Sequence, residues 1–206
     1  AQNKFSLCHA SIVRILNSLS IRLGDARRAI GFYEQGLVIV REIGDRHSEG
    51  GVVGNLGNAY LRLGDARRAI GCYEQKLEIA REFGDRRGEG YALGNLGLAY
   101  ARLGDYRRVI GFYEQGLVIV SEIGDRRGEG VALGNLGLAY AGLGDYRRAI
   151  GFYEQQLEIT REIGDRQGEA NGSWNLGLAY EQLGDLPRAI AVMQVSVEFK
   201  RAIDHP

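Results

Sequence analysis

The sequence predicts an all-α protein built from stacked copies of one helical hairpin. The 206 residues repeat with a period of 40, and the segments 91–130 and 131–170 differ at only nine places. No segment shows the alternation of apolar and polar residues, flanked by hairpin turns, that is typical of strands. A fixed period of this length indicates a repeat architecture, in which each hairpin buries its apolar face against the next.

Glycine and aspartate mark the ends of the expected helices. Gly84 and Gly104 stand where the left-handed residue that ends a helix is most often glycine. Asp85 and Asp105 follow directly, and a carboxylate at this place can accept a hydrogen bond from the first turn of the next helix. Two helices separated by so short a connection form an antiparallel hairpin.

The same punctuation recurs along the whole chain, so we expect a single array over residues 1–206. In one hairpin we expect a shorter helix over about 87–103 and a longer helix over about 106–123. Residues 5–22 match the repeat poorly and are expected to form an N-terminal cap helix. The five expected hairpins cover approximately residues 5–43, 47–83, 87–123, 127–163 and 167–203.

Several residues recur at the spacing of a known repeat. Leu96, Gly97 and Tyr100, followed by Val109 and Tyr113, reproduce the tetratricopeptide pattern L-G-x2-Y…A-x3-F. The chain resembles a tetratricopeptide repeat protein. The 40-residue version, with NLGxAYxxLGDY and GDRxGEG, resembles the Partner of Inscuteable type of G-protein signalling modulator and the arrays of bacterial signalling proteins. This resemblance implies a right-handed superhelical solenoid whose first helices line a concave groove.

Composition argues against several classes of function. The 26 Lys and Arg balance the 26 Asp and Glu, so no bulk field attracts nucleic acid or an acidic membrane. The two cysteines do not recur with the repeat, which favours a reducing compartment, and we expect a cytoplasmic protein. No C-x2-C, H-E-x-x-H or phosphate-binding loop is present, so we expect neither enzyme activity nor a metal or cofactor.

An asparagine occupies the same place in four helices, at Asn55, Asn95, Asn135 and Asn175. Its carboxamide carries a donor and an acceptor, so it can bond the N–H and C=O of an extended peptide without reading the side chains. The resemblance implies that these asparagines contact a bound peptide. Alternatively, each asparagine bonds the adjacent hairpin and latches the repeats together, and both roles are compatible.

Other residues share the stripe of the asparagines, because places i, i+4, i+7 and i+11 lie on one helix face. Trp174 replaces a glycine beside Asn175, where it serves either as a stacking platform or, more often for a lone tryptophan, as packing. The glycines at 54, 94 and 134 leave room for a ligand backbone. The further residues of the expected peptide site are Asn58, Tyr91, Leu98, Leu138 and Leu178.

Arginines form a second row at Arg22, Arg62 and Arg102, which ends at Gly142 and Gln182. This row favours a partner with acidic residues over the N-terminal half of the groove. The alternative is that these arginines are solvated helix ends that complement the helix dipole.

A different set of paired arginines lies in the first turn of each second helix, where the helix dipole disfavours positive charge. We expect them to pair with acids such as Glu89 or Glu129. These arginines are Arg67, Arg68, Arg107, Arg108, Arg147 and Arg148.

The last helix carries Met193 and Val195 where other hairpins have tyrosine and glutamine. This apolar flank suggests that the array continues or associates with itself. The leading hypothesis is a scaffold that binds a peptide segment of a partner protein. The alternative is a structural or self-associating spacer or sensor array without a dedicated peptide ligand.

Overall fold

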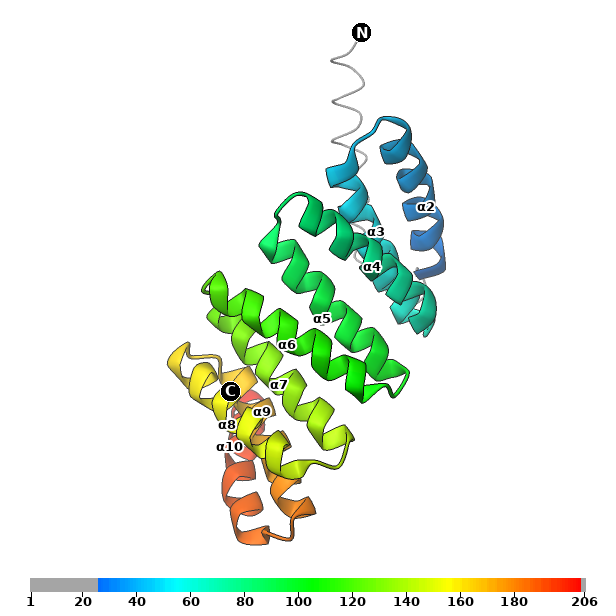
Figure 1. The fold of residues 1–206 in the computed structure, drawn as a ribbon. Helices are drawn as coiled ribbons and strands as arrows, with labels where there is room; N and C mark the ends of the chain where they lie inside the picture. Colours follow the sequence, from blue (N-terminus) through cyan, green and yellow to red (C-terminus); the bar gives the residue numbers. More distant parts are fainter. Residues whose placement is uncertain (1–25, 205–206) are drawn as a thin grey trace. The chain divides into compact units, whose positions relative to one another are not determined.

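The computed structural model describes residues 26–204, and within this range the regular structure consists of nine helices and no strand (Figure 1). This confirms the predicted all-α fold. The expected cap helix over residues 5–22, and Arg22 with it, lie outside the described residues. The helices are α2 (Ala26–Glu42), α3 (Arg46–Arg62), α4 (Ala66–Glu82), α5 (Arg86–Arg102), α6 (Tyr106–Glu122), α7 (Arg126–Gly142), α8 (Tyr146–Glu162), α9 (Arg166–Gln182) and α10 (Leu186–Asp204).

The predicted helix ends are confirmed by the backbone geometry. Gly84 and Gly104 have φ of 65° and 74°, the left-handed region that suits glycine. Asp85 Oδ1 accepts a hydrogen bond from the Gly88 amide at 2.8 Å. Glycine recurs with positive φ every 20 residues from Gly44 to Gly184, so the helices α2 to α9 all have 17 residues. The expected difference in length between the two helices of the hairpin at 87–123 is therefore wrong.

The chain divides into two compact units, Ala1–Leu103 and Gly104–Pro206. The boundary falls inside the third predicted hairpin, between α5 and α6. In the described part of the first unit, α2, α3, α4 and α5 each pack on the next helix; in the second unit α6 to α10 do the same, and α7 also contacts α9 (Figure 1).

Close helix crossings depend on glycine, as the sequence predicts. A Cβ atom at Gly137 of α7 would lie 2.4 Å from Cε1 of Tyr153 on α8. A Cβ atom at Gly57 of α3 would lie 2.7 Å from the same atom of Tyr73 on α4. Both tyrosines are fully buried, with Tyr153 at 1% and Tyr73 at 0% exposure. Each glycine thus lets a tyrosine ring fill the centre of its hairpin.

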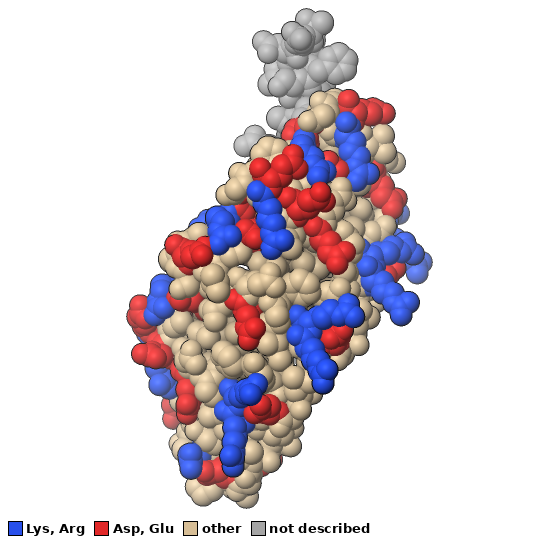
Figure 2. Space-filling model, in the orientation of Figure 1, with Lys and Arg blue, Asp and Glu red and all other residues tan. Residues whose placement is uncertain are grey.

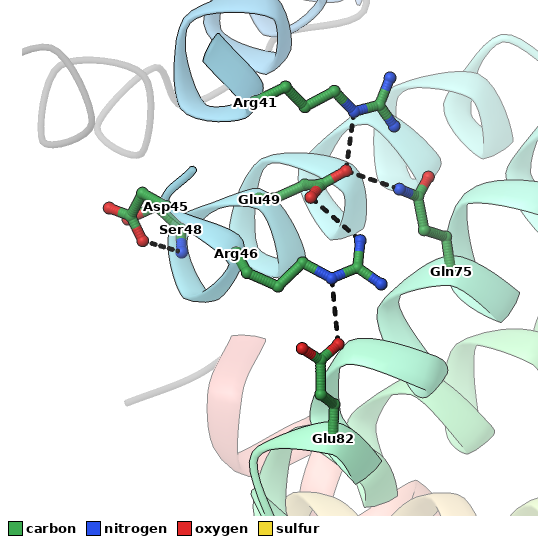
Figure 3. Close-up of polar contacts among 7 residues, drawn as sticks. All are labelled: Arg41, Asp45, Arg46, Ser48, Glu49, Gln75 and Glu82. Carbon is green, nitrogen blue, oxygen red and sulfur yellow. Dashed lines mark hydrogen bonds and ion pairs between the residues drawn. The ribbon is translucent and has the colours of Figure 1, made fainter. Parts of the chain in front are cut away.

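A buried carboxylate joins successive helices of the first unit (Figure 3). Glu49 at the start of α3 accepts hydrogen bonds from Arg41 Nε at 2.7 Å, Arg46 Nη1 at 3.0 Å and Gln75 Nε2 at 2.8 Å. Arg46 also donates through Nε to Glu82 Oε2 at 3.0 Å. Burial alone would raise the pKa of Glu49, but the two arginines hold it below its ordinary value. The cluster ties α2, α3 and α4 together.

For Arg68, Arg108 and Arg148, three of the paired arginines, the expected glutamate partners are wrong. Arg68 bonds Asp65, three residues earlier, with Nε 2.8 Å from Oδ2, and its guanidinium lies over the Tyr60 ring. The equivalent pairs are Arg108 with Asp105 and Arg148 with Asp145. Each of these aspartates caps the helix three residues before the arginine. It therefore lies closer to the guanidinium than a glutamate on another helix does.

Charge is finely mixed on one face of the molecule (Figure 2). Acidic and basic side chains are interspersed on the face shown in Figure 2, and neither sign forms a continuous sheet there. This matches the formal net charge of zero.

Among the described residues, no helix combines the length and the apolar character needed to cross a membrane.

Candidate peptide-binding site

The four recurring asparagines lie at the middle of α3, α5, α7 and α9, and each is half-buried. In the second unit, Asn135 and Asn175 line one pocket of about 830 Å³, which we call the amide pocket. Leu138 and Trp174 line it as well, and their exposures of 50% and 45% leave both side chains accessible. The structure thus brings four predicted site residues together. Leu178, also exposed, is not among the residues that line the amide pocket.

The sequence analysis missed Gln156, which reaches the amide pocket from α8. Its side chain is 9% exposed, and its Oε1 has no hydrogen-bond partner among the described residues. A Cβ atom at Gly134 would lie 2.8 Å from this oxygen, so Gln156 fills the space that the sequence assigned to a ligand. Its signal was the variation at one repeat place, which reads Gly36, Lys76, Gly116 and Gln156.

In the first unit the same repeat place is occupied by Lys76. Its Nζ would lie 3.0 Å from a Cβ atom at Gly54, and it lines a pocket of about 280 Å³ together with the exposed Tyr91. Burial lowers the pKa of Lys76, and the nearby Asp85 opposes this shift. In the described first unit, neither Asn55 nor Asn95 lines this pocket.

Asn58 and Leu98 complete the predicted stripe in the first unit. Leu98 on α5 is 42% exposed. The carboxamide oxygen of Asn58 accepts a hydrogen bond from the Tyr73 hydroxyl at 2.8 Å. This bond holds α3 to α4 within one hairpin, so Asn58 has a structural role.

Gly142, where the arginine row ends, lies against a tyrosine ring. Arg62 and Arg102 are the exposed last residues of α3 and α5. At the equivalent end of α7, a Cβ atom on Gly142 would lie 2.5 Å from Cε1 of Tyr106. The tyrosine takes the space that a longer side chain at 142 would need. In the first unit, Ala66 occupies the repeat place of Tyr106.

The last helix is packed more closely than the sequence suggested. Met193 is half-buried, and its Cγ would lie 2.4 Å from a Cβ atom at Gly177 of α9. Val195 is half-buried too. The large apolar residues that α10 exposes most are Leu186 and Ile190, at 56% and 62%.

Known structures share this fold. BtubC (BKLC) from P. vanneervenii is 24% identical, with a TM-score of 0.81, and the match covers 89% of this chain and 76% of that one. A putative kinesin light chain from Podosopora anserina with nearly identical TPR-like repeats is 17% identical (TM-score 0.75; 100% and 99% covered). A Rap protein complexed with Competence and Sporulation Factor is 15% identical (TM-score 0.72; 85% and 49% covered).

No curated protein sequence matches the chain. A family model does, and its two matched segments span residues 49–122 and 124–202, which is well over half of the sequence. The helical hairpins, their glycine crossings and this match agree, and the family generally provides scaffolds for contacts between proteins. The chain belongs to the tetratricopeptide repeat family.

Proposed function

We propose that this protein binds an extended or partly helical segment of a partner protein through the amide side chains of its odd-numbered helices. The observation that carries the proposal is that Asn135 and Asn175, two half-buried amides from different helices, line one pocket beside Gln156. The Oε1 atom of Gln156 is itself buried without a donor, so the proposal assigns the contacts with a peptide backbone to the two asparagines.

The chemistry of the amide pocket suits a peptide backbone. Asn135 and Asn175 each supply a donor and an acceptor on the same pocket wall, which an extended chain can bond without regard to its sequence. Leu138 and Trp174 supply apolar contacts for one or two side chains. In this proposal Asn55 and Asn95 make the same kind of contact in the first unit.

The charge of the first unit indicates an acidic partner segment. Lys76 lines the pocket there, and Arg62 and Arg102 end the two helices that carry Asn55 and Asn95. In the second unit a neutral glutamine replaces the lysine, and Gly142 replaces the arginine. In this proposal the ligand places acidic residues over the first unit, and the amide pocket of the second unit is itself lined by Arg127, Lys200 and Arg201 beside Asp165. The Rap protein complexed with Competence and Sporulation Factor supports ligand binding by this fold.

The double variant Asn135→Ala plus Asn175→Ala is expected to weaken peptide binding by roughly ten- to a hundredfold. Each asparagine would lose hydrogen bonds to the ligand backbone worth about 1 kcal/mol or somewhat more. Peptides are selected from a random library on the full chain, and the dissociation constant of the best binder is measured by calorimetry.

The matched control removes two amides that point elsewhere. Gln115 and Gln155 donate to backbone carbonyls of their own helices, so Gln115→Ala plus Gln155→Ala should leave the affinity unchanged. Equal affinity in both double variants, with helix content intact, would contradict the asparagine mechanism. It would favour the alternative, a self-associating spacer array, which light scattering would then reveal as oligomers that use the exposed Leu186 and Ile190.

Arg62→Ala plus Arg102→Ala is expected to weaken binding of an acidic peptide several-fold at low salt and much less at 0.5 M salt. Exposed ion pairs contribute up to about 1 kcal/mol each, and salt screens them over about 10 Å at 0.1 M. Arg62→Lys plus Arg102→Lys keeps the charge and should retain most of the affinity. If the alanine variant binds as tightly as wild type at low salt, these arginines are only solvated helix ends.

A further inference from the structure

The second unit carries another pocket, of about 670 Å³, which shares no lining residue with the amide pocket. It is lined by Leu117, Val118 and Ser121 of α6, by Glu129 of α7 and by Ile159 of α8. We call it the carboxylate pocket. It is a second surface, separate from the proposed peptide site.

The other hairpins show what normally fills this place. In each, the arginine in the last turn of an even-numbered helix donates its Nε–H to Oε1 of the glutamate eight residues later. The donor–acceptor distances are 2.7 Å for Arg41 and Glu49, 2.8 Å for Arg81 and Glu89, and 2.7 Å for Arg161 and Glu169. Figure 3 shows the first of these bonds.

In the remaining copy, which is the third along the chain, Ser121 stands where the others have the arginine. Glu129 keeps its other bond, in which Arg126 Nη1 donates to Oε2 at 2.5 Å. Among the described residues, however, no donor reaches Oε1. In the first unit Gln75 donates to Glu49, but its repeat counterpart Gln155 donates to the Gly151 carbonyl instead of to Glu129. Glu129 is only 15% exposed, and it lines this pocket together with Ser121, the residue that replaces the arginine.

We propose that the carboxylate pocket binds the side chain of an arginine from a partner protein. The guanidinium would take the place of the missing internal one and donate to Glu129 Oε1. The arginine's aliphatic stem would lie along Leu117, Val118 and Ile159. Glu122 and Glu158 at the rim add negative charge.

The positive charge of Arg126 does not prevent a second guanidinium from binding Glu129. Arg126 also pairs with Glu162, so a second carboxylate compensates it. In the first unit the equivalent Arg46 pairs with Glu82, and Glu49 still accepts both Arg46 and Arg41. One glutamate therefore accommodates two guanidinium groups in this fold.

Arginine is favoured over lysine for a geometric reason. The guanidinium is planar, is less strongly hydrated than an ammonium group, and can donate sideways through Nε, as all three internal arginines do. A lysine ammonium has no such donor part-way along the side chain. The proposal therefore commits to arginine, and the comparison with lysine tests it.

The experiment titrates the full chain with N-acetyl-arginine amide and with N-acetyl-lysine amide at constant ionic strength, followed by backbone amide chemical shifts. Saturable shifts at Ser121 and Glu129 are expected with the arginine probe, and at least fivefold weaker binding with the lysine probe. Ser121→Arg supplies the guanidinium internally and is expected to abolish these shifts. Ser121→Ala leaves the pocket open and is expected to preserve them.

Folding is not at risk in this design, since Ser121→Arg copies the arrangement of Arg161 and Glu169, and it should raise the melting temperature by a few degrees. Equal response to both probes, or shifts that persist in Ser121→Arg, would overturn the proposal. Light scattering should show the same mass for wild type and Ser121→Arg. Oligomers that disappear on Ser121→Arg would mean that a second copy supplies the arginine, and would overturn the assignment to a partner protein.

Discussion

Gly137→Val is expected to lower the free energy of unfolding by about 3 kcal/mol, near the upper end of the cost of overpacking a core. The new Cβ atom would lie 2.4 Å from Cε1 of Tyr153, a contact that real structures do not contain. Tyr153 is 1% exposed and is packed in the core of the second unit with Leu157 and Leu176, so its ring has no free space to move into. Urea denaturation followed by circular dichroism measures the change.

Gly151→Val is the matched control, because Gly151 lies in the adjacent helix α8 with no atom within 4 Å of its expected Cβ position. Glycine and valine differ in helix propensity by only about 0.4 kcal/mol, so this variant should be close to wild type. Similar urea midpoints for the two variants would show that the missing side chain at Gly137 is not needed for the stability of the hairpin.

Glu49→Ala is expected to destabilise the protein by about 2 kcal/mol at pH 7, since hydrogen bonds to a charged group are worth roughly 1.5–3 kcal/mol. Glu129→Ala should cost only about 1 kcal/mol, because this glutamate has Arg126 but no counterpart of Arg41. Arg41 and Arg46 are partly exposed, so water can solvate them when Glu49 is removed. The loss of stability is therefore smaller than for a fully buried ion pair.

The effect of Glu49 depends on pH in a defined direction. Its pKa is lowered in the folded state, so the folded protein binds fewer protons than the unfolded chain, and the carboxylate stabilises the fold above the unfolded pKa of about 4.5. This stabilisation is lost as the pH falls through the lower folded pKa. Wild type and Glu49→Ala should therefore converge in acid. A difference that stays constant from pH 7 to pH 3 would mean that the lost contact is not ionic.

Local features of the fold were predictable because a residue and its near neighbours determine them. Gly84 and Asp85 end one helix and begin the next through their own backbone and side-chain geometry, so the pattern alone located the helices to within a residue or two. The tetratricopeptide family followed from the spacing of Leu96, Gly97 and Tyr100, and the family match confirms it.

Features that depend on the surroundings of a side chain were not predictable in the same way. Arg68 was assigned a distant glutamate, but Asp65, three residues earlier, is nearer. In the sequence, Gln156 is only one of the nine positions that differ between residues 91–130 and 131–170. That its oxygen is buried without a donor is evident only once α8 packs between α7 and α9. The positions that vary between copies were thus more informative about the site than the repeated ones.

The bond between Arg41 and Glu49 joins the end of one hairpin to the start of the next, and the same bond recurs at Arg81 and Glu89. Removing residues 46–85 from the gene would place Arg41 eight residues before the glutamate that is now Glu89, and Asp45 before the helix that now follows Asp85. The new junction would keep the arginine–glutamate bond of the two it replaces. Unequal recombination between such copies can therefore lengthen or shorten the protein by whole hairpins while this bond is kept at the new junction.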